Sequence, residues 1–339
     1  MSRLRNFLIP FSLAAGAAAL LTTWWIRQGR VNRAALASNT EELTWQALRQ
    51  LNVAAESRMI AVNGLELHTI LAGPLDGPLV ILLHGFPECW YTWRNQIRPL
   101  VEAGYRVVVP DQRGYNLSDK PRAIHHYRLE ALSADMVELI RSFGRDKAIV
   151  VGHDWGGLVA WHLAMHHPDV VEKLIVLNAP HPAAYLREIR SNPAQQRKSW
   201  YWGFFQLPIV PEELLGHDPI ESARRTFRRN AINQEAFSSF DLHVMATALA
   251  QPDALTSMLN WYRAAARDRS ALENLRPIEQ PTLLIWAEDD AALGRSLTYG
   301  LEPWINNLTI YTIPQCGHWV QNEASEEVNE QLLAFLGND

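Results

Sequence analysis

Residues 152–157 read GHDWGG, follow the apolar run KAIVV and precede a helical pattern. A turn of the form Gly-x-nucleophile-x-Gly between a strand and a helix exposes its central side chain at the end of the strand. That side chain is usually a serine, but here it is Asp154. A carboxylate that attacks a tetrahedral carbon forms an ester, which water can cleave at the carbonyl, whereas a serine would form a stable ether. Asp154 therefore predicts a substrate with an alkyl leaving bond, such as an epoxide or an alkyl halide.

Two backbone N–H groups are expected to point at the same centre. One belongs to Trp155, which follows Asp154 in the turn, and the other belongs to Phe86 in the loop HGFPECW. A pair of such donors forms an oxyanion hole, which stabilises the negative charge of a tetrahedral intermediate. We therefore expect a tetrahedral step at the carbonyl of the Asp154 ester.

A histidine and an acid complete the set in the chain order nucleophile, acid, histidine. His318 lies in CGHWVQNE, between the last apolar strand run and the closing helix. The acid should end the preceding strand, in WAEDDAAL, where Glu288, Asp289 and Asp290 are all available. The order and spacing predict a base that activates water, with a carboxylate that orients it.

The elements that would hold these side chains alternate between strands and helices over residues 59–182. Such alternation predicts an α/β fold with a mostly parallel sheet. The alternation stops over 183–275, where the pattern is helical and rich in aromatic residues and proline, and it resumes over 276–339. We therefore predict a core in two parts, 59–182 and 276–339, with a helical lid inserted at 183–275 and a linker at 34–58.

The N-terminus contains 20 consecutive residues without a charge, Phe7 to Ile26. As a helix, this run would span roughly 30 Å of hydrocarbon. Arginines flank both of its ends, so its orientation stays open. We predict that residues 1–33 are a membrane anchor with its flanks, a transmembrane helix of the signal-anchor type, which makes the chain a single-pass membrane protein. A cleaved signal peptide is the alternative.

The composition narrows the class of partners. The chain has 339 residues and a formal net charge of −5, without the basic stripe typical of nucleic-acid binding, so no nucleic-acid partner is predicted. His162 and His166 are one helical turn apart, but no third ligand accompanies them, so no metal is predicted. No organic cofactor is needed by the chemistry above. The oligomeric state is left open.

Six motifs in this order resemble the epoxide hydrolases of the α/β-hydrolase superfamily, and most of all their membrane-anchored members. The resemblance covers the chain from about residue 59 to the C-terminus, and its motifs are HGFPECWYTWR, DQRGYNLSDKP, GHDWGG, NAPHP, WAEDD and GHWVQNE. It implies an α/β-hydrolase fold with Asp154 as nucleophile, His318 as base and Asp290 as the partner of the base. Asp289 becomes the weaker choice.

The resemblance also implies a pair of lid tyrosines that donate hydrogen bonds to the epoxide oxygen. Tyr201 in SWYWGFFQLP and Tyr262 in LNWYRAAA match those positions. With Trp155 and Trp319, they are expected to contact the substrate. The alternative is that both tyrosines are packing residues of the lid.

The predicted function is hydrolysis of a small apolar epoxide, such as a lipid epoxide, to a vicinal diol by way of an ester on Asp154. The first alternative is a haloalkane dehalogenase. Those enzymes often carry an asparagine after HG and hold the halide with indole or amide donors, whereas this chain has Phe86 there and tyrosines in the lid. The second alternative is a ligand receptor without catalysis, which the intact set of catalytic groups disfavours.

Overall fold

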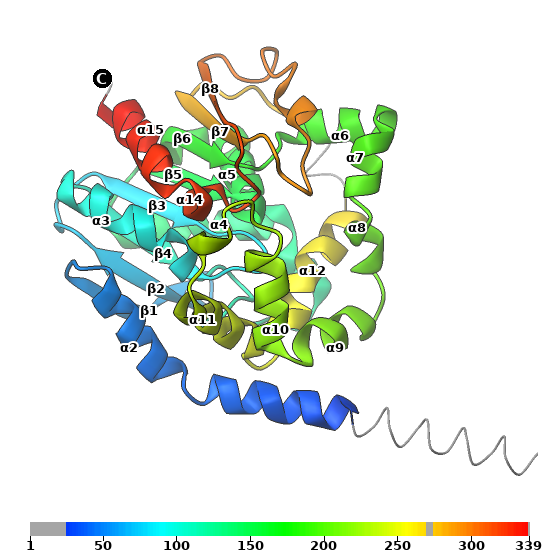
Figure 1. Ribbon diagram of the computed structural model, residues 1–339. Coiled ribbons are helices and arrows are strands. Elements are labelled where there is room, and N and C mark those ends of the chain that lie inside the picture. The colour runs from blue at the N-terminus through cyan, green and yellow to red at the C-terminus, as the bar shows by residue number, and fades with distance from the viewer. Residues whose placement is uncertain (1–24, 269–273, 338–339) are drawn as a thin grey trace, which may run out of the picture.

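The computed structural model describes residues 25–268 and 274–337 (Figure 1). Within them, eight strands form one sheet in the order β1-β2-β4-β3-β5-β6-β7-β8. β1 and β2 form an antiparallel hairpin, and β2 is also antiparallel to β4. The remaining neighbours are parallel. The strands are β1 (Ala55–Val62), β2 (Leu65–Ala72), β3 (Leu79–Leu83), β4 (Arg106–Pro110), β5 (Ala148–His153), β6 (Val171–Leu177), β7 (Thr282–Ala287) and β8 (Leu308–Ile313).

The central strands are apolar on both sides because helices cover both faces of the sheet. In β3, Leu79, Ile81 and Leu83 point into one apolar cluster, while Val80 and Leu82 point into the other. The first cluster includes residues of α4 (Leu129–Ser142) and α5 (Asp154–His166). The second includes residues of α3 (Arg94–Glu102) and α15 (Ser325–Gly337). The predicted α/β-hydrolase fold is confirmed.

The lid lies between β6 and β7 in the sequence and forms the green and yellow flank of Figure 1. Three of its helices begin with a proline at the first position, where a missing N–H costs nothing. The lid elements are α6 (Pro182–Ser191), α7 (Pro193–Lys198), α8 (Tyr201–Phe204), α9 (Val210–Gly216), α10 (Pro219–Ala223), the π-helix η4 (Arg224–Arg228), the 3₁₀ helix η5 (Gln234–Ala236), α11 (Ser239–Ala250) and α12 (Ala254–Arg267).

Short helices occupy the loops of the core. They are the 3₁₀ helices η1 (Trp90–Trp93), η2 (Ile124–Tyr127), η3 (Pro168–Val170) and η6 (Arg295–Thr298), and the single-turn helix α14 (Val320–Glu323). Several of them follow the carboxyl ends of strands, where the loops of an open α/β sheet gather side chains from distant parts of the sequence.

The described part of the N-terminus packs on the folded domain. Residues 25–37 are helical, and the ring of Trp25 stacks on that of His217 in the lid with centroids 4.0 Å apart. Asn32 donates a hydrogen bond to the carbonyl of His217 at 3.2 Å. The segment expected as a linker, 34–58, contains α2 (Thr40–Gln50) and the first residues of β1, and α2 buries Leu43 and Leu48 against the core.

The prediction of a membrane location is corrected by the structure. Within residues 25–268 and 274–337, no helix combines the length and the apolar character that a membrane span requires. The apolar run 7–26 lies outside the described residues except for Trp25 and Ile26. The helix that follows carries Arg27, Arg30 and Arg33, and Arg33 faces Glu213 of the lid at 3.8 Å. The assignment as a transmembrane, signal-anchor protein is therefore withdrawn.

Candidate active site

Asp154 stands at a tight turn between β5 and α5, and its backbone has φ = +50°. This left-handed conformation is strained for a residue with a side chain and is typical of functional sites. The start of α5 can lie this close to the end of β3 because Gly156 has no side chain. A Cβ there would lie 2.2 Å from the carbonyl oxygen of Leu83. The sequence GHDWGG thus forms the sharp strand-to-helix turn that it predicted.

The loop after β3 approaches the carboxylate of Asp154 from the other side. The N–H of Phe86 donates to Oδ1 of Asp154 at 2.8 Å. Gly85 makes this approach possible, since a Cβ there would lie 2.5 Å from Cβ of Asp154. The N–H of Trp155 belongs to the first turn of α5, where the amides have no partner within the helix. Both expected oxyanion donors therefore belong to segments that meet at Asp154.

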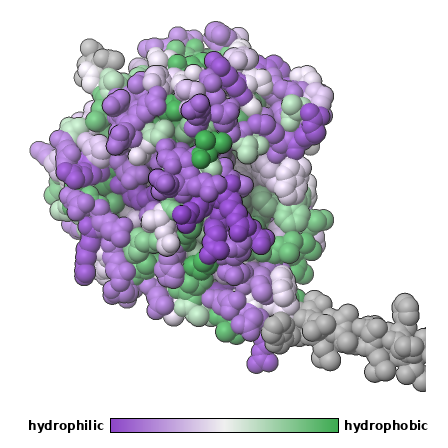
Figure 2. Space-filling view, in the orientation of Figure 1, coloured by the Kyte–Doolittle hydropathy of each residue, from purple (hydrophilic) through white to green (hydrophobic). Residues whose placement is uncertain are grey.

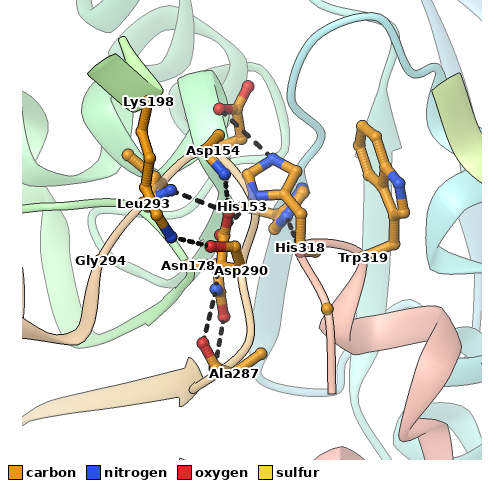
Figure 3. Close-up of polar contacts among 12 residues, drawn as sticks. His153, Asp154, Asn178, Lys198, Ala287, Asp290, Leu293, Gly294, His318 and Trp319 are labelled. Atoms are coloured by element: carbon orange, nitrogen blue, oxygen red, sulfur yellow. Dashed lines mark hydrogen bonds and ion pairs between the residues drawn. The ribbon is translucent and has the colours of Figure 1, made fainter. Parts of the chain in front are cut away.

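His318 lies between two carboxylates (Figure 3). Its Nδ1 is 2.6 Å from Oδ2 of Asp290, and its Nε2 is 3.7 Å from Oδ2 of Asp154. The two other candidate acids point elsewhere, because Glu288 pairs with Arg295 at 2.8 Å and Asp289 is exposed. Of the three carboxylates at the end of β7, the structure brings Asp290 to the histidine.

Asp290 is buried, and its carboxylate is surrounded by donors. Oδ2 also accepts from Nδ2 of Asn178 at 2.8 Å, while Oδ1 accepts from the N–H groups of Ala292 and Leu293 at 2.7 and 2.9 Å. Burial alone would raise the pKa of Asp290, but His318 and these donors outweigh it and hold the pKa below its ordinary value. The acid is thus kept ionised and in one orientation.

The charges around His318 raise its basicity. Burial alone would lower the pKa of the imidazole, but Asp290, followed by Asp154 and Glu88, outweighs it and raises the pKa to about 9. Asp154 loses its charge when it becomes an ester, which removes one of these contributions. The basicity of His318 therefore depends on the covalent state of Asp154.

The two lid tyrosines reach the same place from different helices. Tyr201 begins α8 and Tyr262 lies in α12, with ring centroids 6.0 Å apart. The ring of Tyr262 packs edge-on against Trp155 at 4.9 Å and Phe86 at 5.2 Å. Burial raises the pKa of both phenols well above its ordinary value, so both hydroxyls keep their protons at neutral pH. The structure thus provides two neutral donors beside the Asp154 carboxylate.

The chain is similar in sequence to a large family of known proteins. Residues 78–325 match the family described as the alpha/beta hydrolase fold. The chain belongs to the α/β-hydrolases. The predicted resemblance to epoxide hydrolases is confirmed by the relatives of this hydrolase. Epoxide hydrolase 1 of Caenorhabditis elegans is 38% identical over 285 residues, which cover 83% of this chain and 70% of that protein. The AB hydrolase superfamily protein YfhM of Bacillus subtilis is 45% identical over 284 residues, which cover 83% of this chain and 98% of that protein.

Solved structures give the same grouping. The epoxide hydrolase of Bacillus megaterium in complex with an inhibitor aligns with a TM-score of 0.77 and 29% identity, over 83% of this chain and 100% of that one. Epoxide hydrolase A of Mycobacterium thermoresistibile aligns with a TM-score of 0.73 and 30% identity, over 84% and 99% of the two chains. This hydrolase therefore shares both sequence and fold with epoxide hydrolases.

A buried pair of residues that the sequence analysis did not single out supports the catalytic turn of this hydrolase. Nδ1 of His153 is 2.8 Å from Oε2 of Glu88, and Nε2 of His153 is 2.9 Å from the carbonyl oxygen of His318. The same Oε2 accepts from the N–H of Gly85 at 2.8 Å. Although burial acts the other way, His153, with Thr92 and the Gly85 amide, holds the pKa of Glu88 below its ordinary value. The sequence contained a signal for this pair, because Glu88 and His153 lie within the motifs HGFPE and GHDWGG.

Two cavities of the hydrolase meet at Asp154, Tyr201 and Tyr262, which line both. The smaller has about 450 Å³ of space free of atoms and is otherwise mostly apolar, with Trp155 in its wall. The larger has about 990 Å³, open to solvent, and includes His318 and Trp319. The exposed Trp200 also lines it, and Figure 2 shows further hydrophobic residues around α8 and α9 on this face. The predicted substrate contacts thus line these two apolar cavities, the smaller and the larger arm of one site, which meet at Asp154.

Proposed function

We propose that this α/β-hydrolase converts apolar epoxides to vicinal diols through an ester on Asp154. The observation that carries the proposal is the meeting of a carboxylate at the catalytic turn, a histidine paired with a second carboxylate, and two protonated tyrosines at one cavity. The first two groups suit nucleophilic attack and hydrolysis. The tyrosines add what an epoxide needs, because its ring oxygen leaves as an alkoxide, which is a strong base.

In the first step, a carboxylate oxygen of Asp154 attacks one ring carbon. The bond between that carbon and the ring oxygen breaks, and its electron pair passes to the oxygen. Tyr201 and Tyr262 stabilise the oxygen by hydrogen bonds that strengthen as its charge develops. The oxygen then takes the proton of one of these hydroxyls, and the phenolate is reprotonated from solvent. The product of this step is a hydroxyalkyl ester of Asp154. The apolar walls of the two arms would hold the substituents of the two ring carbons.

In the second step, His318 removes a proton from water, and the water oxygen attacks the carbonyl carbon of the ester. Esterification removes the Asp154 charge, one of those that raise the pKa of His318, and so favours the neutral imidazole at this stage. The amides of Phe86 and Trp155 stabilise the tetrahedral oxyanion. When this intermediate collapses, the bond between the carbonyl carbon and the alkyl oxygen breaks, and that oxygen takes the proton from His318 and leaves as the diol. The water oxygen stays on Asp154, whose new carboxyl group loses its remaining proton to solvent.

A single turnover in oxygen-18 water tests the proposal with styrene oxide as substrate. The label should enter Asp154, found by mass spectrometry of the peptide that contains it, and the diol should carry none. Label in the diol, with Asp154 unlabelled, would show direct attack by water and exclude the ester. A bromoalkane run in parallel separates this activity from dehalogenation, since bromide release at a rate similar to diol formation would contradict the choice of an epoxide.

A further inference from the structure

Helix α7 of the lid is hydrogen-bonded to the loop of the core that carries Asp290, residues 290–294. The bonds come from Gln195 and Lys198, and Tyr201 follows Lys198 by three residues. The segment that presents a tyrosine to the cavity is therefore the same segment that holds the acid loop. Neither residue belongs to the set that carries out the proposed reaction.

Gln195 binds the loop at two points. It is 1% exposed. Its Nε2 donates to the carbonyl of Ala292 at 2.9 Å, and its Oε1 accepts from the N–H of Gly294 at 2.9 Å. Nε2 also donates to Oγ of Ser199 at 3.1 Å. A buried side-chain amide that both donates to and accepts from one loop fixes the loop against sliding, because any shift would leave buried polar groups without partners.

Lys198 binds the loop at the acid itself. Its Nζ donates to the backbone carbonyl oxygen of Asp290 at 2.5 Å (Figure 3). A hydrogen bond from an ammonium group is roughly twice as strong as one between neutral groups. The bond also puts a positive charge on the lid side of a residue whose carboxylate faces His318 and Asn178 on its other sides.

The loop is thus held from both sides. On the inner side, the carboxylate of Asp290 accepts from the N–H groups of Ala292 and Leu293. On the outer side, Gln195 binds the carbonyl of Ala292 and the N–H of Gly294. Ala292 lines the larger arm of the cavity and Leu293 the smaller, so a shift of the loop would move the acid and the cavity wall together.

We propose that Gln195 and Lys198 are positioning residues, which hold the loop 290–294 and so keep Asp290 directed at His318 while the ester of Asp154 is hydrolysed. The proposal rests on the proposed function above. Both residues act through Asp290, and they keep the acid in place while the lid segment that carries Tyr201 is docked on the core. The lid thereby takes part in the second step as well as in the first.

The test uses the full chain and styrene oxide, with alkylation and hydrolysis followed separately by stopped-flow tryptophan fluorescence. Lys198→Met and Gln195→Met should slow hydrolysis of the ester by about tenfold, since a misplacement of about 1 Å can cost a hundredfold in rate. Alkylation, which does not depend on Asp290, should change less than hydrolysis. Lys198→Arg keeps a charged donor and should restore hydrolysis.

The pH dependence of hydrolysis separates positioning from simple packing. Of the groups that face His318, Asp290 stays charged during hydrolysis while Asp154 is a neutral ester, and Glu88 lies behind the ring of His153. Gln195→Met removes no charge but loosens the hold on Asp290, the main group that raises the pKa of His318, so the acid limb of its rate profile should move to lower pH. Lys198→Arg keeps a charged donor to the loop and should leave the limb in place.

Arg197→Met and Gln196→Met are matched controls, because both residues are exposed on the same helix and Gln196 bonds within the lid. Hydrogen exchange gives a readout without substrate, in which the amide of Gly294 should exchange faster in Gln195→Met. Unchanged hydrolysis in both loop variants, or equal losses in the controls, would overturn the inference. If His318→Gln forms no adduct on Asp154, the proposed function fails instead. Slow exchange at Gly294 in Gln195→Met would show separately that Gln195 does not hold the loop.

Discussion

Nε2 of His318 lies 3.7 Å from Oδ2 of Asp154, which is beyond the range of a hydrogen bond. In a serine hydrolase the histidine must bond to the nucleophile, because it has to remove the hydroxyl proton. A carboxylate carries no such proton at neutral pH. The gap between these two atoms therefore suits a histidine whose task is to activate a water molecule after the nucleophile has reacted.

Replacing His318 by glutamine should separate the two steps. Alkylation of Asp154 does not need the base, so His318→Gln should consume about one equivalent of styrene oxide and then stop. Mass spectrometry of the intact chain should show one adduct per molecule, located on Asp154 after digestion. Continued turnover with an unmodified Asp154 would show that another group supplies the nucleophile or the base.

The acid that pairs with His318 can be identified by two neighbouring substitutions. Loss of an aspartate that orients a catalytic histidine costs about 10⁴ in rate in a serine protease. Asp290→Asn should therefore slow hydrolysis of the ester by roughly 10³- to 10⁴-fold. Asp289→Asn changes an exposed carboxylate one residue away and should retain nearly full activity. Similar losses in both variants would point to a general disturbance of the loop rather than to the acid.

The tyrosine pair should control the first step. Tyr201→Phe or Tyr262→Phe leaves one donor to the ring oxygen, so each should slow alkylation by roughly ten- to a thousandfold. The double variant should be slower than either, though not additively, because both hydroxyls act on one atom. Stopped-flow fluorescence measures this step directly.

Tyr185→Phe is a suitable control for the tyrosine variants. Tyr185 lines the smaller arm with the pair, but its hydroxyl is bonded to Ser199 at 3.4 Å. The Tyr185→Phe variant should be alkylated at close to the wild-type rate. Hydrolysis of the ester should be unchanged in all the tyrosine variants. Wild-type alkylation by the double Phe variant would mean that the tyrosines serve only as lid packing.

The raised pKa of His318 should make the stability of the folded chain depend on pH. Burial opposes the shift, but the surrounding carboxylates raise the pKa from 6.5 to about 9 in the folded state. A group with a raised folded-state pKa contributes stability that is fully present below its unfolded-state pKa and is lost as the pH rises through the folded-state value. The contribution should therefore be present below about pH 6.5 and decline towards pH 9.

Urea unfolding between pH 6 and pH 9.5 measures this contribution as the difference between wild type and His318→Gln. The difference in free energy of unfolding should shrink as the pH rises, since the variant has no titrating imidazole at this position. Groups that titrate in both proteins cancel in the comparison. A difference that stays constant over this range would contradict the raised pKa.

The sequence predicted which residues meet at the cavity because they lie in local motifs with a fixed chain order. Asp154 and the strand-to-helix turn follow from GHDWGG, and His318 follows from its place after the last strand run. The choice of Asp290 over Asp289 rested on resemblance alone. Two adjacent carboxylates at a strand end differ only in the direction of their side chains, which the backbone of the folded loop decides.

Other features depend on contacts that no local pattern reveals. The pairing of Glu88 with His153 joins residues 65 positions apart, and Lys198 reaches the carbonyl of Asp290 across 92. The contacts of the N-terminal helix are of the same kind. Its arginines suit the flank of a membrane anchor in the sequence, but Arg33 pairs with Glu213 and Trp25 stacks on His217, both in the lid.

The nucleophile and the tyrosines come from different layers of the molecule, since Asp154 belongs to the core and Tyr201 and Tyr262 to the lid. In an in-line displacement, the carboxylate attacks from one side and the oxygen departs on the other, so the configuration of the attacked carbon is inverted. Cleavage of the ester at its carbonyl leaves that carbon untouched, so the configuration changes once and is then preserved. A cis-disubstituted epoxide should accordingly yield the threo diol, and its proton NMR spectrum should contain no erythro isomer.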